Sequence, residues 1–521
     1  MRRFAPVIAL LAVALHTCSL AVAGLADDVR TAIARAGLGD AAVSVSVRES
    51  DSSELLVSLQ GERPMIPASN MKVLSSGTAL HVLGPEFFFR TRLVHDGERL
   101  WVIGDGDPAF GDPALLELMS YTDASGVTHQ GMDVEELLGL WVSAVKAADI
   151  RGVKELLVDD RVFAREPVHP SWPVEQLNTR SFAQVSGLNF HTNVLHFFPR
   201  PGTQARPEVG DLRPHASWIQ IVNKATARTG PNDRQTVWLT RPADVNTFTV
   251  FGNVKYAAKE PVPVTINDVP EFFARLLAER LETAGVHVAA SRVASADDGE
   301  AAGRLVGPIV QTPIATVVAR CNTDSQNLYA ESLLKRTGRA MTGQPGSWAT
   351  GAGAVRHVVQ QRVGDRLAAP LQVADGSGLS RDNRVTADML TAWLDSFHRD
   401  ATAMAGPNAS PDEIEQVRLR NAIGRNFIES LAVGGETGTV RSRFNRLDAL
   451  GVVAQCKTGY INGVSCLSGF VTAPDGRRRS FSVLCNELVQ PDAVGKAKRL
   501  QESIVELVAG DMTAARVLGG E

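Results

Sequence analysis

The sequence lacks the features that identify several common classes of protein. Its 53 lysines and arginines are balanced by 57 aspartates and glutamates, which gives a formal net charge of −4, and the sequence indicates no clustered basic face. This absence argues against a nucleic-acid partner. The 11 histidines show no HExxH or other ligand spacing, so we expect neither a metal site nor a cofactor.

Long apolar runs are also absent beyond the first residues. Residues 4–15 form one short apolar run that follows two arginines, and "SLAVAG" then gives the small-residue pattern of a cleavage site. The run is too short to span a bilayer well, and no later segment is apolar enough to do so. We therefore expect residues 1–23 to be a signal peptide and the mature chain to be secreted or periplasmic, with no transmembrane segment.

Cysteine is scarce, which makes a disulfide-dependent fold unnecessary. Beyond the expected signal peptide the cysteines are Cys321, Cys456, Cys466 and Cys485. A chain of 521 residues buries enough apolar surface to fold without disulfides. An oxidising compartment permits pairing, but the connectivity cannot be deduced from spacing, and buried free thiols remain equally open.

Hydrophobic periodicity predicts strands near both ends of the chain and helices between them. The alternating stretches are "AAVSVSVRES" and "ELLVSLQG" near the start, and "GVVAQCKTGY", "SCLSGFVTAP" and "RSFSVLCNEL" near the end. The length favours two or three domains. We predict an α+β domain formed by residues 24–88 and 305–521, and a mainly β inserted region of one or two subdomains over residues 89–304.

One predicted helix carries a serine and a lysine but no acidic residue. The stretch "IPASNMKVLSSGTALHVLG" spans residues 66–84, with Ser69 in the first turn and Lys72 three positions later. Positions three apart share one face of a helix. A neutral lysine can take the proton of a serine hydroxyl, and burial lowers a lysine pKa because the charged form loses its solvation. The stretch therefore predicts a nucleophilic serine with a lysine as its base.

The SxxK pattern by itself is weak evidence, because it occurs twice more. Ser143 lies in the middle of a predicted helix, where a hydroxyl serves local packing. Ser332 precedes Lys335, which falls in the last turn of a helix that we expect to end at Gly338, where a cation suits the helix dipole. Ser69 alone stands at a helix start in an apolar context without acids.

Two further motifs follow Ser69 in a meaningful order. "SQN" at residues 325–327 lies between two predicted helices, and "KTG" at residues 457–459 lies on a predicted strand. SxxK, SxN and KTG on a helix, an interhelical loop and a strand are the arrangement of active-site serine enzymes that recognise penicillin. The 256 positions between Ser69 and Ser325 leave too long a gap for a plain β-lactamase core.

The chain thus resembles the class C low-molecular-mass penicillin-binding proteins, the D-alanyl-D-alanine carboxypeptidase/endopeptidase family, which carries a large insert between its first two motifs. Similar stretches cover nearly all of the mature chain, among them "PASNMK", "GDGDPAF", "VSGLNFHTN", "NTDSQNLYAESLL", "DGSGLSRDNRVT" and "GETGTVRSRF". The resemblance implies a penicillin-binding/β-lactamase-like transpeptidase domain, with an antiparallel sheet and helices. It also implies a serine D-Ala-D-Ala carboxypeptidase that acts on peptidoglycan stem peptides and is acylated by β-lactams.

The same resemblance implies roles for individual residues. Ser69 is implied as the acylated nucleophile, with Lys72 as its base, and Ser325 as the relay of a proton to the leaving D-alanine. Asn327 would hold the substrate backbone and Lys72, and Lys457 would set the electrostatics near Ser325. Substrate-binding roles are implied for Thr458, Gly459, Tyr460, Arg381 and Asp160. The backbone N–H groups of residues 69 and 460 would form the oxyanion hole.

Three positions depart from the family pattern and leave the rate and the substrate preference open. Tyr460 stands where a serine or threonine usually follows KTG, Gln326 is the middle residue of SxN, and Thr437 stands where an acid is common. The alternatives are a DD-endopeptidase that cleaves peptide cross-links, a hydrolase of another D-amino-acid peptide or ester, and a β-lactamase-like hydrolase. A non-catalytic peptidoglycan-binding or scaffolding protein is the fourth, and Tyr460 is its main support.

Overall fold

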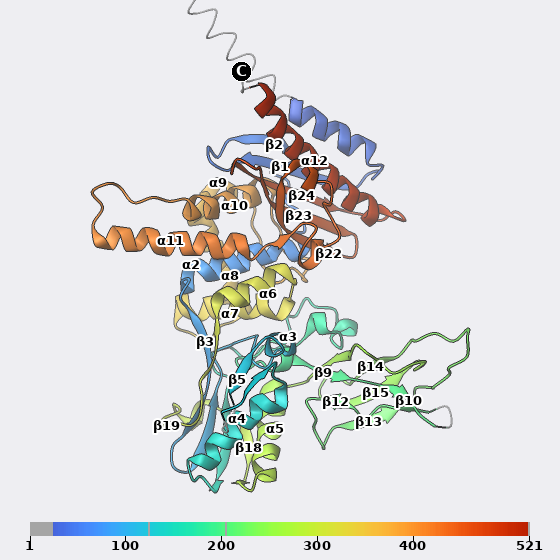
Figure 1. The fold of residues 1–521 in the computed structure, drawn as a ribbon, viewed down its shortest axis with the longest axis vertical. Helices are drawn as coiled ribbons and strands as arrows, with labels where there is room; N and C mark the ends of the chain where they lie inside the picture. The colour runs from blue at the N-terminus through green and yellow to red at the C-terminus, as the bar shows by residue number, and fades with distance from the viewer. Residues whose placement is uncertain (1–23, 123–125, 204–205, 519–521) are drawn as a thin grey trace, which may run out of the picture. The chain divides into compact units, whose positions relative to one another are not determined.

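The computed structural model describes residues 24–122, 126–203 and 206–518 of the chain (Figure 1). The signal peptide expected at residues 1–23 lies outside the described residues. The chain divides into two compact units: the first comprises Met1–Pro85, Val318–Gln326 and Ala352–Glu521, and the second comprises Glu86–Val317 and Asn327–Gly351. The domain bounds expected from the sequence, at residues 88/89 and 304/305, stay a prediction.

The first unit is built on an antiparallel six-stranded sheet with the order β2-β1-β24-β23-β22-β21. Its strands are β1 (Ala42–Glu49), β2 (Leu55–Leu59), β21 (Ala432–Val433), β22 (Val453–Ile461), β23 (Val464–Thr472) and β24 (Arg478–Asn486). Strand β1 pairs with β24, so segments from the two ends of the chain lie side by side in one sheet. The predicted combination of helices and an antiparallel sheet is confirmed.

Helices flank this sheet. They are a helix over residues 24–35, α2 (Met71–Leu83), α9 (Asp365–Ala368), α10 (Ala387–Ala401), α11 (Pro411–Glu429) and α12 (Ala493–Leu518), while α6 (Ile314–Thr323) and α8 (Trp348–Val363) cross the bounds between the units. Val45 and Val47 of β1 share a hydrophobic core with α12. The alternating Ser46 points to the other face, where its Oγ lies 2.9 Å from Oγ1 of Thr391 on α10. Strand alternation thus gives the sheet one apolar face and one hydroxyl-rich buried face.

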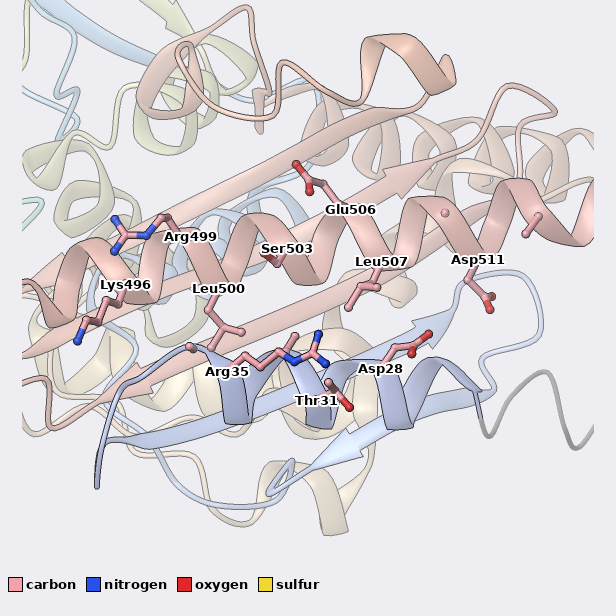
Figure 2. A pocket seen from close by; sticks show the side chains of 14 residues that line it. Asp28, Thr31, Arg35, Lys496, Arg499, Leu500, Ser503, Glu506, Leu507 and Asp511 are labelled. Atoms are coloured by element: carbon pink, nitrogen blue, oxygen red, sulfur yellow. The ribbon is translucent and has the colours of Figure 1, made fainter.

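A surface groove runs between the helix over residues 24–35 and α12 (Figure 2). It has a volume of about 960 Å³, and Figure 2 shows Leu500 and Leu507 of α12 turned toward the neighbouring helix. Its lining also includes Asp28, Arg35 and Arg499, so both signs of charge are mixed. None of the site residues expected from the sequence lines this groove.

The second unit is centred on a mixed sheet with the order β18-β8-β4-β3-β19, in which β20 also pairs with β3. Its strands are β3 (Phe88–His95), β4 (Arg99–Ile103), β8 (Glu155–Asp159), β18 (Ser291–Val293), β19 (Arg304–Leu305) and β20 (Val310–Pro313). Helices α4 (Val134–Ala147) and α5 (Val269–Thr283) share one core with this sheet, in which Trp141 and Phe273 are buried. A capping box formed by Asp133 and Glu136 begins α4.

Short strands make up much of the rest of the second unit. They are β5 (Ser120–Thr122), β6 (Thr128–Gln130), β7 (Gly152–Val153), β9 (Val194–Phe197), β10 (Arg200–Pro201), β11 (Pro207–Glu208), β12 (Leu212–Arg213), β13 (Gln220–Asn223), β14 (Trp238–Thr240), β15 (Thr247–Phe251), β16 (Val262–Thr265) and β17 (His287–Val288). The helices α3 (Pro113–Leu116) and α7 (Asn327–Thr342) complete it. In the part of the chain that the structure describes, no helix is both long and apolar enough to cross a membrane.

The four cysteines of the described chain are free thiols, and all four are buried. Burial raises the pKa of the Cys456 thiol to about 12 and that of Cys485 to about 12. These side chains therefore behave as small apolar groups. Of the two possibilities left open by the sequence, disulfides and buried free thiols, the structure supports buried free thiols.

Asp395 on α10 predicts a pH dependence of folding. Its carboxylate accepts a hydrogen bond from Ser50 Oγ at 2.8 Å, and burial raises its pKa from 3.8 to about 7. The folded state therefore keeps a proton that the unfolded chain has lost, so this group lowers stability as pH rises from about 4 to about 7, by up to about 4 kcal/mol. We expect Asp395→Asn to flatten the fall of unfolding free energy over that pH range, as measured by urea titration. Equal slopes in both proteins would contradict the assignment.

Candidate active site

Ser69 and Lys72 meet at the start of α2. The serine lies in a 3₁₀ turn, Ala68–Asn70, and the α-helix itself begins at Met71. Ser69 therefore lies two residues before the α-helix and not in its first turn, where the sequence predicted it. Lys72 Nζ donates a hydrogen bond to Ser69 Oγ at 2.9 Å and another to the Ser377 carbonyl at 2.8 Å. The lysine is 0% exposed. The structure therefore brings the expected hydroxyl and amine into direct contact in a buried position.

Strand β22 carries the KTG motif past this turn. A Cβ atom at Gly459 would lie 2.6 Å from the Pro67 carbonyl oxygen and 3.1 Å from the Asn70 backbone nitrogen, so only glycine lets the strand pack so closely against the turn. Lys457 Nζ donates to Ser325 Oγ at 2.8 Å and to the Thr458 carbonyl at 3.0 Å. The serine of SxN and the lysine of KTG thus form a second serine–lysine pair in the same unit.

The electrostatics of Lys457 are set by burial and by a neighbouring cation. The side chain is 0% exposed, and desolvation, followed by repulsion from Lys72, lowers its pKa to about 7. A charged amine loses solvation on burial, which favours the neutral form. Lys457 can therefore gain or release a proton near neutral pH, and such a pKa in a polar cluster is typical of a functional site.

The "DGSGLSRDN" stretch forms a braced loop beside Ser69. Asp375 accepts from the backbone N–H of Gly378 at 2.8 Å and of Ser380 at 2.6 Å. The loop supplies the Ser377 carbonyl to Lys72. Gly378 has a φ of 84°, and a Cβ there would lie 1.8 Å from the Ala68 carbonyl oxygen. A glycine is therefore required at this position both by the backbone conformation and by its contact with the turn that holds Ser69.

Arg381 and Tyr460 lie at the edges of the KTG strand. Arg381 Nη1 donates to the carbonyl of Asn462, in the turn that follows β22, at 2.8 Å. Tyr460 is 59% exposed, and Lys498 Nζ lies 6.0 Å from the centroid of its ring. Tyr460 is thus a surface aromatic residue that needs no burial for folding. The substrate-binding roles of both residues stay predictions.

Thr439 is a neighbour of the KTG motif that the sequence did not single out. It lies in the "GETGTV" loop, and its Oγ1 accepts from Thr458 Oγ1 at 2.8 Å. A Cβ at Gly438 would lie 2.2 Å from the Thr323 carbonyl oxygen, so glycine lets this loop approach the segment that leads to Ser325. The signal available in the sequence was the "GETGTV" stretch itself, which marked the loop without indicating which side chain reaches β22.

Asn327 begins α7 in the second unit, two residues after Ser325. Its Nδ2 donates to the Ser181 carbonyl at 2.9 Å. Asp160 lies in the same unit, where its carboxylate pairs with Arg165 at 3.1 Å and burial raises its pKa. The catalytic role expected for Asn327 and the substrate contact expected for Asp160 stay predictions.

Helix α7 is fastened to the second unit by side chains from several turns. Tyr329 donates to Asp112, and Arg336 pairs with Asp105 at 3.0 Å. Both acids come from residues 104–112, "GDGDPAFGD". Ser332 Oγ accepts from Asn189 at 3.2 Å. These contacts fix the helix whose first residue is the asparagine of SxN.

The SxxK pair on α7 has a structural setting. Lys335 is buried; its Nζ donates to the Glu166 carbonyl at 2.7 Å and lies 3.6 Å from the centroid of the Trp348 ring. The helix does not end at Gly338, as expected from the sequence, but continues to Thr342. Lys335 therefore does not serve the helix terminus.

In the described ranges no group of three or more His, Cys, Asp or Glu could hold a metal ion.

The chain is similar to known proteins over most of its length. The sequence matches the family described as D-Ala-D-Ala carboxypeptidase 3 (S13) over residues 25–406 and 412–508. It is 28% identical over 487 residues to a D-alanyl-D-alanine carboxypeptidase from Actinomadura sp. (strain R39), covering 89% of this chain and 81% of that protein. It is 21% identical over 459 residues to the D-alanyl-D-alanine carboxypeptidase DacB of Haemophilus influenzae, covering 86% of each.

A solved structure shows the same fold. The crystal structure of penicillin binding protein 4 from Haemophilus influenzae matches with a TM-score of 0.68 at 19% identity, covering 94% of this chain and 99% of that one. The same protein has been solved in complex with a β-lactam, with a TM-score of 0.64 at 18% identity and the same coverage. The penicillin-binding fold expected from the motifs is confirmed.

The contact of Gly378 with the Ser69 turn leads to a paired test. Gly378 and Gly364 share a φ of 84°, but a Cβ at Gly364 meets nothing within 4 Å, whereas one at Gly378 would overlap Ala68. We expect Gly364→Ala to cost about 1–3 kcal/mol of stability from backbone strain alone and to keep the acylation rate with a fluorescent penicillin. Gly378→Ala should in addition slow acylation at least about tenfold, which corresponds to ~1.4 kcal/mol.

Both variants are measured on folded protein, with thermal melting to set the assay temperature. An acylation rate in Gly378→Ala equal to that in Gly364→Ala would contradict the inference that this glycine positions Ser69.

Proposed function

Because the chain belongs to the D-Ala-D-Ala carboxypeptidase 3 (S13) family, we propose that it is a serine D-Ala-D-Ala carboxypeptidase that acts on peptidoglycan stem peptides. The observation that carries this proposal is the pair of buried lysines, each in contact with a serine hydroxyl: Lys72 with Ser69 at 2.9 Å and Lys457 with Ser325 at 2.8 Å. A serine needs such a base to become a nucleophile.

In the proposed reaction Ser69 attacks the carbonyl carbon of the penultimate D-alanine. When Lys72 is neutral, its Nζ accepts the Ser69 proton across the 2.9 Å contact. The backbone N–H groups of Ser69 and Tyr460 stabilise the oxyanion. Ser325 passes a proton to the amine of the departing D-alanine, and Asn327 holds the substrate backbone. Water then hydrolyses the ester on Ser69 and releases the shortened peptide.

The terminal carboxylate of the substrate needs a cationic and hydroxyl-bearing site. Lys457 supplies positive charge when protonated, which its pKa of about 7 allows in neutral and mildly acidic solution. Thr458 and Thr439 supply two adjacent hydroxyls, 2.8 Å apart. We propose that Thr439 compensates for the absence of a hydroxyl side chain at Tyr460, and that Arg381 lies near the substrate from the neighbouring loop.

The setting and the ligands follow from the same proposal. The expected signal peptide at residues 1–23 would export the chain to a secreted or periplasmic space, where peptidoglycan is found. β-Lactams carry a strained amide beside a carboxylate, so they should acylate Ser69 by the route that the peptide takes. Asp160 is proposed as a further substrate contact from the second unit.

Replacement of the nucleophile tests the proposal directly. Ser69→Ala should abolish covalent labelling by a fluorescent penicillin and reduce D-alanine release from a model pentapeptide at least about a thousandfold. Ser143→Ala removes the exposed serine of another SxxK pattern and is the matched control, which should keep both activities. Labelling that persists in Ser69→Ala would overturn the assignment.

Purified cross-linked muropeptides separate the alternative activities. Release of D-alanine from uncross-linked pentapeptides with intact dimers identifies a carboxypeptidase, whereas conversion of dimers to monomers identifies an endopeptidase. A chain that takes the penicillin label but turns over neither substrate would be a binding or scaffolding protein.

The proposed hydroxyl pair gives a sharper test of the carboxylate site. Thr439→Val keeps the side-chain shape but removes the hydroxyl, so we expect kcat/KM for a D-Ala-D-Ala peptide to fall about ten- to a hundredfold, the loss of one hydrogen bond to a charged group. Thr439→Ser should restore it. Steady-state kinetics with the peptide, and with the same peptide amidated at its C-terminus, measure the effect. An equal fall for both peptides would show that Thr439 does not serve the carboxylate.

A further inference from the structure

One face of a small sheet in the second unit carries aromatic side chains that do not belong to the hydrophobic core. Strands β13, β15 and β14 lie in that order, with β15 in the centre (Figure 1). The side chains of Leu239, Phe248 and Val250 alternate inward and belong to the core. Their neighbours point outward, and we call them the outer face: Val222, Lys224, Trp238, Thr240, Thr249 and Phe251. Because the inward residues already supply the packing, outward aromatic residues need another explanation.

Aromatic rings and a cation form one row across the outer face. Trp238 on β14 is paired in register with Phe251 on β15, and their rings stack at 4.7 Å between centroids with an interplanar angle of 15°. Lys224 Nζ lies 5.6 Å from the centroid of Phe251. Trp238, at the end of this row, is nevertheless 51% exposed. A large indole surface is thus held in one orientation but left open to solvent.

Hydroxyl groups form the next row. Thr249 is paired in register with Val222 on one side and with Thr240 on the other. None of the six residues of the outer face carries a carboxylate. The face therefore offers an aromatic ring surface, hydroxyls and one ammonium group, a combination that suits a neutral ligand with an apolar side and a hydroxylated rim.

The sheet is held in shape by one asparagine beside this face. Asn253 Nδ2 donates to the carbonyls of Arg228 and Arg234, both at 3.0 Å, and its Oδ1 accepts from the Arg228 N–H at 2.8 Å. These bonds fix the segment that leads into β14. Because little ordering is then left to occur on binding, the outer face is preorganised for a ligand.

We propose that the outer face binds the glycan strand of peptidoglycan, a polymer of N-acetylated amino sugars. A pyranose ring presents C–H groups on one side, which pack on an aromatic ring, and hydroxyl and acetamido groups around its rim, which bond to Thr240, Thr249 and Lys224. A second copy of the chain would require a larger continuous apolar patch than one indole surrounded by polar residues. This inference rests on the proposed function, since the peptides that the chain cleaves are attached to such a glycan.

Binding of a peptide-free glycan to the full chain tests this inference. The probes are a β-1,4-linked tetramer of N-acetylglucosamine and glycan strands stripped of their peptides, and the measurements are intrinsic tryptophan fluorescence and calorimetry. We expect saturable binding that Trp238→Val weakens at least about tenfold, while Trp238→Tyr restores part of it because a ring is present again. Valine favours a strand, so this variant keeps the sheet.

Leu118→Ala removes an exposed apolar side chain elsewhere in the same unit and is the matched control; it should bind like the wild type. Hydrolysis of free pentapeptide should be unchanged in Trp238→Val, while hydrolysis of glycan-linked pentapeptide should show a raised KM. Failure of the wild type to bind either probe, or equal binding by Trp238→Val, would overturn the inference. Ser69→Ala should bind glycan normally, which shows that glycan binding does not depend on the peptidase site. A wild-type chain that binds glycan but releases no D-alanine from pentapeptide would count against the proposed function alone.

Discussion

Two lysines that are removed from solvent organise the site. Lys72 and Lys457 are both 0% exposed, and burial of an ammonium group costs several kcal/mol. The chain offsets this cost with hydrogen-bond acceptors for each lysine, among them one serine hydroxyl and one backbone carbonyl. The contacts that stabilise the lysines are therefore the same contacts that orient Ser69 and Ser325. Repulsion from Lys72 also lowers the Lys457 pKa. The same repulsion that destabilises the charged form therefore lets Lys457 release its proton near neutral pH.

Close backbone approaches bring these pairs together. The turn that holds Ser69 is flanked by strand β22 at Gly459 and by the braced loop at Gly378, and at each position a Cβ would meet backbone atoms of the turn. Gly438 lets the "GETGTV" loop approach Thr323 in the same way. Backbone cannot move aside as a flexible side chain can, so these glycines fix the distances between the motifs. The geometry of the candidate site thus depends on glycines, which have no functional side chain.

The sequence was sufficient for the chemistry of each motif, because SxxK, SxN and KTG each place their functional groups within a few residues. It was not sufficient for contacts made across loops, such as the bond between Thr439 and Thr458. The predicted end of α7 at Gly338 was also wrong, because a glycine near the end of a helical pattern commonly marks the helix terminus. In the fold, a Cβ at Gly338 would lie 2.6 Å from the backbone nitrogen of Gly351 on α8. Close packing of two helices, which no local pattern reveals, explains this glycine.

The SxN triplet also has two different structural anchors. Ser325 belongs to the first unit, where the Lys457 ammonium holds its hydroxyl. Asn327 belongs to the second unit and is the first residue of α7, which Asp105 and Asp112 of the "GDGDPAFGD" stretch fasten to that unit. Ser325 has a φ of 59°, a left-handed conformation that is costly for a serine, and the bond to Lys457 contributes to holding it. A triplet that appears as one motif in the sequence therefore depends on folding of the second unit as much as on folding of the sheet that carries Lys457.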